Sequence, residues 1–302
     1  MRLFRVTVPV SSANLGSGFD PLGLGLSLYN FFDVRAFLKK GSYVLEIIGE
    51  GSGELGRENN ALIQSYEFAC NKWGIDPPGL DLCSLNAIPM ARGLGSSSTA
   101  IVAGVAIANT LRENSLQKDE LLSLMVELEG HPDNVVPCCM GGMVVSGVDG
   151  GIIRFVKMPP LPEDMVAVVA VPEVRVSTQS AREALPTKVF LKDAVYNISR
   201  AALLAASWST GNWSNLPWAM GDRLHQPFRA RLFPGGEEIL RELSNAPNCS
   251  GVAISGSGPS MIAFARGLAG DIAKLMCSIF SRHGIRSRFF VLREDREGLS
   301  IF

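Results

Sequence analysis

The sequence predicts an α+β protein of two domains, and three observations support this. Its 302 residues exceed what one compact core ordinarily organises. Strand and helix signals are mixed in both halves, which is typical of α+β domains rather than of a barrel. Pro159, Pro160 and Pro162 cluster between the halves, as in a boundary segment. We therefore expect one domain over residues 1–160 and a second over residues 161–302.

The first half is expected to begin with strands, because apolar, β-branched and aromatic residues are enriched there. A helix over residues 60–73 is predicted to end at Gly74, before a proline-rich breaker. After a later helix, His131 to Asn134 is expected to form a turn. The predicted strands are residues 3–10, 33–38, 43–48, 80–86, 143–148 and 152–156, and the two later helices are residues 97–111 and 119–129.

The second half is expected to open with a strand at residues 166–171. Helices are predicted near residues 190–208 and 235–244. A strand–turn–strand unit follows at residues 251–265, and then a helix and a final strand.

Composition limits the kinds of partner. The net charge of −1 offers no basic field for nucleic acid and no polybasic segment for a membrane surface. No apolar run approaches the roughly 18 residues that cross a bilayer, and the N-terminus is typical of a strand rather than a signal peptide. Six cysteines without a C-x-x-C pair indicate reduced thiols. We expect a cytoplasmic protein with a small-molecule partner; the sequence leaves a homodimer open.

The strongest chemical signal is a glycine-rich loop before a helix. Its glycines allow backbone N–H groups to approach an anion, and the helix directs its positive end at that anion. The serines and threonine could bind phosphate oxygens and Mg²⁺, or could cap a helix that has no ligand. No lysine follows, so the loop is not a Walker A loop. Its residues are Pro89, Met90, Ala91, Arg92, Gly93, Leu94, Gly95, Ser96, Ser97, Ser98 and Thr99.

Two further loops are polar and rich in small residues. Residues 9–20 follow the first strand and carry Asn14 and Asp20 on a flexible turn, where small-ligand groups commonly lie. Residues 255–260 could be a binding loop or an ordinary tight turn. Residues 51–56 fit G-x-G-x-x-G, but the helix does not begin at the last glycine, so dinucleotide binding is not favoured.

Taken in this order, the three loops resemble the three motifs of the GHMP kinases, and the resemblance spans the chain. It implies an N-terminal domain of ribosomal-protein-S5-like topology, a C-terminal ferredoxin-like domain and an active site between them. It also implies that residues 89–99 wrap the phosphates of ATP. By position, Ser97 matches the family's Mg²⁺ ligand. Glu127 fits best as the metal carboxylate, with Glu129 as the alternative.

Four segments resemble the homoserine kinases within that superfamily: residues 12–20, 129–134, 177–182 and 222–229. The resemblance implies that Asp20 holds a substrate ammonium, and that Arg182 and Arg229 hold its carboxylate. Arginine suits a carboxylate better than lysine does. The residues implied near the substrate hydroxyl are Asn14, His131, Asn134 and Thr178.

The predicted reaction is ATP-dependent phosphorylation of L-homoserine to O-phospho-L-homoserine, a step towards threonine. His131 and Asn134 are the candidate catalytic residues. Asn134 can orient a hydroxyl but cannot take its proton, so we expect no protein general base. The alternatives are another GHMP kinase, acting on shikimate, mevalonate or a sugar, and a non-catalytic ligand sensor of the same fold. A sensor would be expected to have a damaged glycine loop, whereas this loop is intact.

Overall fold

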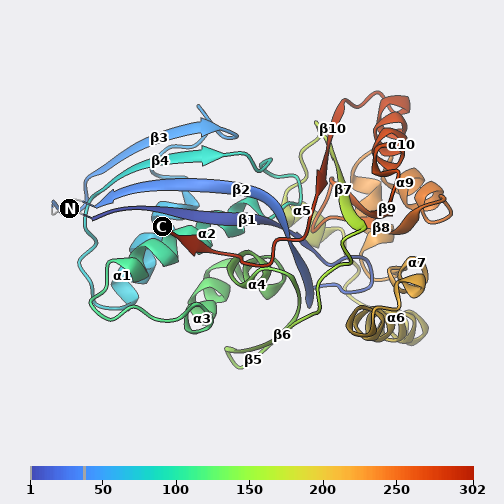
Figure 1. Cartoon of the computed structure of the whole chain (residues 1–302), viewed down its shortest axis with the longest axis horizontal. Coiled ribbons are helices and arrows are strands. Elements are labelled where there is room, and N and C mark those ends of the chain that lie inside the picture. The colour runs from blue at the N-terminus through green and yellow to red at the C-terminus, as the bar shows by residue number, and fades with distance from the viewer. Residues whose placement is uncertain (1, 37–38) are drawn as a thin grey trace.

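Two β-sheets organise the chain, one in each half of Figure 1. The structure is a computed structural model that describes residues 2–36 and 39–302. In the first sheet the strand order is β11-β1-β2-β4-β3, and β5 joins β2 and carries β6. Its strands are β1 (Arg2–Ala13), β2 (Leu22–Ala36), β3 (Tyr43–Gly49), β4 (Leu80–Asn86), β5 (Met143–Asp149), β6 (Ile152–Lys157) and β11 (Ser300–Ile301).

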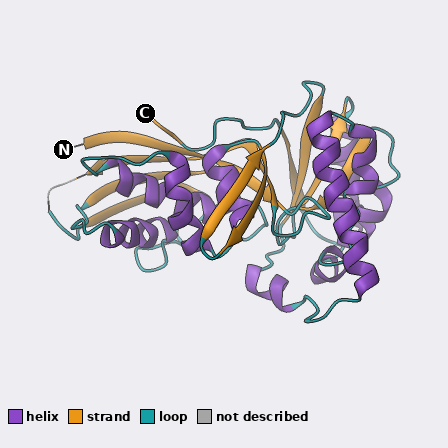
Figure 2. Ribbon diagram, turned by 90° about the horizontal axis from the view of Figure 1, so that it is seen from below, coloured by secondary structure: helices purple, strands orange, loops and turns teal. Residues whose placement is uncertain are grey.

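Four helices cover one face of the first sheet (Figure 2). They are α1 (Ala61–Lys72), α2 (Ser96–Thr110), α3 (Lys118–Glu129) and α4 (Pro132–Met140). Small residues let α2 pack closely against α1. A Cβ on Gly104 of α2 would lie 2.3 Å from the carbonyl oxygen of Leu62 in α1. In the same way, a Cβ on Gly23 of β2 would lie 1.9 Å from the carbonyl oxygen of Asp133. These two glycines therefore allow α2 to pack closely on α1, and α4 on β2.

The second sheet has the order β10-β7-β9-β8 and is antiparallel throughout. Its strands are β7 (Met165–Pro172), β8 (Cys249–Ile254), β9 (Met261–Arg266) and β10 (Ser287–Leu292). The helices of this half are α5 (Thr178–Glu183), α6 (Leu191–Thr210), η1 (Trp213–Asn215), α7 (Leu216–Ala219), α8 (Gln226–Arg229), η2 (Ala230–Leu232), α9 (Gly236–Leu243) and α10 (Ala269–Arg282).

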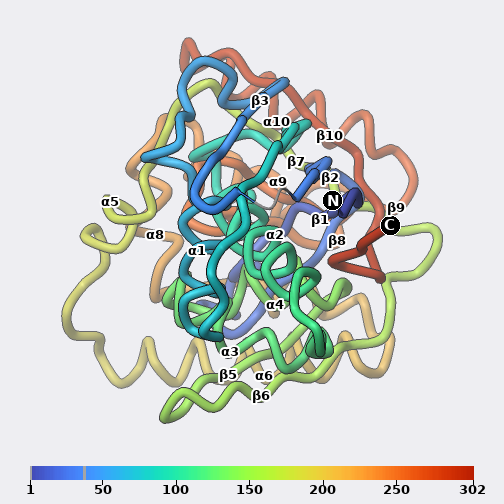
Figure 3. Tube along the Cα trace, turned by 90° about the vertical axis from the view of Figure 1, so that its left-hand side faces the viewer, coloured from blue at the N-terminus to red at the C-terminus, as the bar shows by residue number. Residues whose placement is uncertain are grey.

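The boundary between the sheets lies where the prolines cluster, because β6 ends at Lys157 and β7 begins at Met165. The end of the chain does not follow this division. It crosses back, and β11 pairs with β1 in the first sheet, with Val6 opposite Ile301. Figures 1 and 3 show the C-terminus beside the first strand.

The observed elements lie close to most predicted positions, but several differ. The turn expected from His131 to Asn134 is wrong, because α4 begins at Pro132, a residue that suits a first helical turn. The strand expected at residues 33–38 belongs to a longer one, β2; residues 37 and 38 lie outside the described part of the chain. The short helices α5, α7 and α8, the 3₁₀ helices η1 and η2, and strand β11 were not predicted. Among the described residues, no helix combines the length and the apolar character needed to cross a bilayer.

Candidate active site

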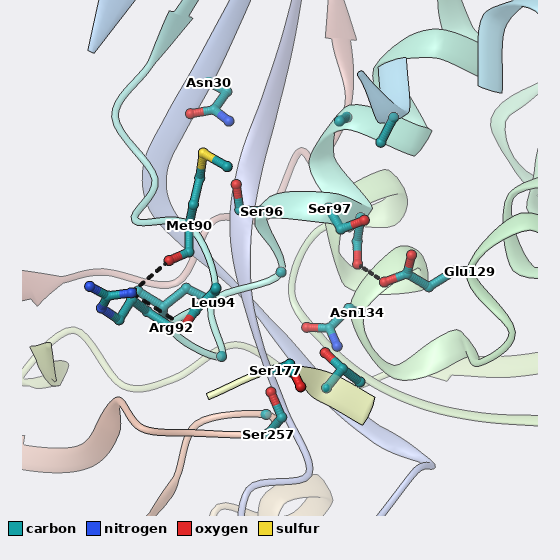
Figure 4. Close-up of a pocket in the computed structure, with 18 of the residues that line it drawn as sticks. Asn30, Met90, Arg92, Leu94, Ser96, Ser97, Glu129, Asn134, Ser177 and Ser257 are labelled. Atoms are coloured by element: carbon teal, nitrogen blue, oxygen red, sulfur yellow. Dashed lines mark hydrogen bonds between the residues drawn. The ribbon is translucent and has the colours of Figure 1, made fainter. Parts of the chain in front are cut away.

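A cavity of about 430 Å³ is lined by residues from both halves of the chain. The glycine loop supplies residues 90–98, and the second half supplies residues 176–178, Arg182, Arg229, Gly256 and Ser257. Figure 4 shows Asn134 and Glu129 reaching into this space from one side and Ser177 and Ser257 from below. The cavity therefore brings together the three loops that the sequence singled out.

The start of α2 provides an anion site. Gly95 is its N-cap residue with φ +63°, and no side chain among the described residues caps the first turn. The first N–H groups of a helix lack intrahelical partners and carry the positive end of the dipole. Their freedom here favours the phosphate-binding interpretation over a helix capped by its own serines. A Cβ on Gly95 would lie 2.3 Å from Ser11 Oγ, so the loop has no room for a side chain.

The third loop supports the glycine loop. Ser255 Oγ donates to the carbonyl oxygen of Gly93 at 2.7 Å, and the Ser260 amide donates to that of Arg92 at 3.3 Å. A Cβ on Gly93 would lie 2.1 Å from the carbonyl oxygen of Ser255. Residues 255–260 are therefore a tight turn that also holds the glycine loop in place.

Two residues at the ends of the predicted phosphate loop, Pro89 and Thr99, are not among those that line the cavity. Thr99 is buried, donates to the carbonyl oxygen of Ser96 at 2.8 Å and accepts from Asn30 Nδ2 at 3.2 Å. Its role is to hold the first turn of α2 on β2.

Glu127, which the sequence favoured as the metal carboxylate, does not line the cavity. Its side chain is 49% exposed and pairs with Lys72 at 3.1 Å. Glu129 lines the cavity, and its carboxylate accepts a hydrogen bond from Ser98 Oγ (Figure 4). Residues two apart on a helix differ by about 200° in direction, so both cannot face the same cavity. Burial raises the pKa of Glu129, and the Ser98 hydrogen bond opposes that shift.

Charged residues gather at the other end of the cavity. Asp20 Oδ1 lies 3.3 Å from Arg182 Nη2, and both side chains are about two-fifths exposed. Arg229 is 2% exposed and donates to the carbonyl oxygen of Gly256 at 3.1 Å. Burial, and then the charge of Arg182, lower the pKa of Arg229. Two guanidinium groups and one carboxylate thus meet beside open space.

The 14–20 loop is shaped by its own side chains. Asn14 Oδ1 accepts from the Asp20 amide at 3.0 Å, and Asn14 Nδ2 donates to the carbonyl oxygen of Gly256 at 2.9 Å. Asn14, Leu15 and Asp20 all have positive φ, at 72°, 47° and 68°. Such a backbone is unfavourable for residues with a Cβ, so contacts from the second half of the chain must hold it.

Polar side chains at the start of α4 face the same space. Asn134 Oδ1 accepts from Ser11 Oγ at 2.9 Å, which leaves its amide nitrogen as donor. His131 Nδ1 lies 2.5 Å from Asp133 Oδ1. Burial lowers the pKa of His131, but the hydrogen bond and charge of Asp133 outweigh it, so the pKa is raised. Thr178, the first residue of α5, also lines the cavity.

Sequence reasoning missed two parts of the site. Asp133 was not singled out, although its position two residues after His131 was a usable signal. The apolar wall could not be found, because it comes from distant elements. The missed residues of this wall are Phe32, Ile47, Leu55 and Leu62, which lie beside Met90 of the predicted loop in the cavity lining.

The arrangement suits a nucleotide and a small charged acceptor. An apolar wall accommodates a flat base, and the start of α2 accommodates phosphates. Residues 2–36 and 39–302 offer no metal site built from protein side chains alone. They contain no group of three or more His, Cys, Asp or Glu side chains placed to hold a metal ion. A metal here would share its ligands between Glu129, serine hydroxyls and phosphate oxygens, which are the hard donors that Mg²⁺ prefers.

Comparison with known proteins agrees with this geometry. Residues 60–142 match the GHMP kinases N terminal domain, and residues 200–281 match the GHMP kinases C terminal domain. A homoserine kinase of Halothermothrix orenii is 37% identical over 98% of this chain and 96% of its own length. One of Moorella thermoacetica is 41% identical over 93% of this chain and 94% of its own length.

Solved structures give the same picture. The homoserine kinase of Cytophaga hutchinsonii superposes with a TM-score of 0.89 at 29% identity, covering 100% of this chain and 98% of its own. A mevalonate kinase, at 14% identity and a TM-score of 0.67, shares the fold. Relatives of more than 30% identity cover nearly the whole chain, and both family domains are present. This protein therefore belongs to the GHMP kinases and has their two-domain fold.

Proposed function

We propose that this GHMP kinase transfers the terminal phosphoryl group of ATP to the hydroxyl of L-homoserine, giving O-phospho-L-homoserine and ADP. One observation carries the proposal: Asp20, Arg182 and Arg229 meet at one end of a cavity whose other side is the glycine loop. The relatives named homoserine kinases, similar over nearly the whole chain, support it.

An amino acid fits the charged end of this cavity. Its carboxylate can accept paired hydrogen bonds from a guanidinium, and its ammonium can donate to Asp20. Arg229 is buried, its pKa is lowered by desolvation, and a bound anion offsets that burial. The Asp20–Arg182 ion pair marks where the two charges of a zwitterion would bind.

The nucleotide is proposed to place its base against the apolar wall and its phosphates at the start of α2. Glu129, with the hydroxyls of Ser97 and Ser98, would hold Mg²⁺, which neutralises charge on the phosphates when bound. The partly buried Glu129 carboxylate fits this role, because its pKa is raised and a nearby cation would stabilise its ionised form.

The hydroxyl of the acceptor is proposed to lie between Asn134 and His131. Ser11 occupies the oxygen of Asn134, so the amide N–H groups can orient the hydroxyl but cannot take its proton. Asp133 occupies Nδ1 of His131, which leaves Nε2 as the ring nitrogen for the substrate. Phosphoryl transfer depends mainly on alignment and charge neutralisation, so this set suffices without a general base.

A cytoplasmic location is also part of the proposal. All six cysteines are free thiols, as expected where the surroundings are reducing. Burial raises the pKa of the Cys139 thiol to about 12, so it is inert.

A coupled ADP-release assay tests the function. Homoserine should be phosphorylated in preference to mevalonate, shikimate and galactose. Arg182→Ala should raise KM for homoserine about tenfold to a hundredfold, because a charge-assisted hydrogen bond contributes about 1.5–3 kcal/mol. KM for ATP should not change. Arg231→Ala is the matched control, because Arg231 is 70% exposed and lies outside the cavity lining. Turnover of another acceptor, or of none, would refute the assignment.

A further inference from the structure

His225 is a buried titratable residue that does not line the cavity. Its side chain is fully buried, and its ring nitrogens contact two parts of the site. Nε2 lies 2.7 Å from the carbonyl oxygen of Gly16 in the 14–20 loop, and Nδ1 lies 3.5 Å from Arg229 Nη1. His225 therefore connects the loop that carries Asp20 with the helix that carries Arg229.

These contacts define the protonation state of the imidazole. A carbonyl oxygen can only accept, so Nε2 must carry the proton. A guanidinium can only donate, so Nδ1 must be free to accept. Burial lowers the pKa of His225, and the charge of Arg229 lowers it further. The charge of Asp222, whose Oδ2 lies 3.7 Å from Nε2, opposes this shift but does not outweigh it. These contacts fit a neutral ring with the proton on Nε2.

The backbone of His225 is held in place by Asp222. This buried carboxylate accepts the amide N–H groups of Leu224, His225 and Gln226 at 3.0, 2.9 and 2.6 Å. It also accepts from Asn197 Nδ2 at 2.7 Å. The imidazole thus projects from a rigid turn, as a positioning group must.

The loop on the other side depends on such support. Three of its residues other than glycine have positive φ, and side chains from the second half of the chain bind its backbone: His225 at the carbonyl oxygen of Gly16 and Asn197 at that of Ser17. Phe19 stacks on the imidazole, with ring centroids 5.0 Å apart and planes 20° apart, and the Arg229 guanidinium lies 5.0 Å from the Phe19 ring. Movement of His225 would therefore shift Phe19 and its neighbour Asp20 relative to Arg229.

We propose that His225 is a positioning residue of the acceptor site, which fixes the spacing between Asp20 and Arg229 through its bonds to Gly16 and Arg229. The inference rests on the proposed function, since these two charges are taken to hold the amino acid. It predicts an effect on the acceptor that does not extend to the nucleotide, because the partners of the His225 ring are Gly16, Phe19, Asp222 and Arg229, and not residues 89–99.

Three replacements separate the two bonds. Gln places an amide N–H near the position of Nε2 and can keep the bond to Gly16. Asn places an oxygen near Nδ1 and can keep only the bond to Arg229, whereas Leu keeps neither. His225→Leu should raise KM for homoserine about tenfold, the equivalent of about one lost hydrogen bond, with KM for ATP unchanged. His225→Gln should return KM to within about threefold of wild type, and His225→Asn should restore less.

Thermal unfolding of each variant confirms that it is folded, and His283→Gln serves as the control, because His283 pairs with Glu238 on the surface. Equal rises in both KM values, or no rescue by glutamine, would overturn the proposal. A second measurement does not depend on turnover: the ring ¹⁵N shifts of His225 in the wild-type protein should show a neutral Nε2–H tautomer at neutral pH. A charged ring, or the Nδ1–H tautomer, would overturn it. If the wild type does not phosphorylate homoserine, the proposed function fails, and the tautomer alone decides whether these bonds exist.

Discussion

Glu129 and Glu127 provide a matched pair on one helix, and replacing each by glutamine tests the metal assignment. Gln at position 129 keeps the size of the side chain and an oxygen that can accept from Ser98, so it removes charge rather than packing. Loss of one preorganised electrostatic contact lowers kcat by about a hundredfold to a thousandfold, or about 2.7–4 kcal/mol. We expect a loss of this size for Glu129→Gln, with a higher Mg²⁺ requirement.

Glu127→Gln breaks only a surface ion pair with Lys72, both of whose side chains are about half exposed. Such pairs contribute about 0–1 kcal/mol, so activity should be unchanged. The assay is coupled ADP release at varied free Mg²⁺. Wild-type kcat and Mg²⁺ dependence in Glu129→Gln, or a large loss in Glu127→Gln, would refute the reasoning.

Glu129→Gln should lower activity but raise the stability of the folded protein. Burial raises the pKa of Glu129, so the folded protein disfavours its ionised form. The wild type is then most stable below the unfolded pKa and loses stability as the pH rises through the raised folded pKa. Gln does not titrate, so Glu129→Gln should unfold at a higher temperature than wild type at neutral pH. The measurement is made by calorimetry without nucleotide or metal; an equal or lower Tm would contradict this sign.

Three further predictions concern the glycine loop, the hydroxyl site and the core. Gly95→Val should abolish ATP binding in a folded protein, because its Cβ would lie 2.3 Å from Ser11 Oγ at φ +63°; calorimetric titration with ATP would check it. Asn134→Ala should lower kcat, and the pH–rate profile should keep its shape because no proton acceptor is removed. Loss of the acidic limb of that profile in the variant would show that a general base had been removed. Gly104→Ala should destabilise the fold by about 1–3 kcal/mol in urea unfolding through overpacking against α1, with no selective effect on either KM.

The sequence by itself determined the features that depend on neighbours along the chain. The glycine loop, the helix start after Gly95 and the hairpin of β5 and β6 are encoded by consecutive residues, because turns, caps and helix periodicity are local. The family resemblance also pointed to Asp20, Arg182 and Arg229, which no local pattern connects and which line the same cavity.

Tertiary structure decided what depends on direction and distance. Whether Glu127 or Glu129 faces the cavity follows from the rotation of α3 against α2, and the contact with Ser98 shows it. The apolar wall and the return of β11 to β1 join segments far apart in sequence, so no local signal could predict them. The helix at Pro132 was missed because proline suits both a turn and a first helical turn. The close packing of this helix on Gly23 of β2, where a Cβ would lie 1.9 Å from the Asp133 carbonyl oxygen, is a tertiary contact with no local signal.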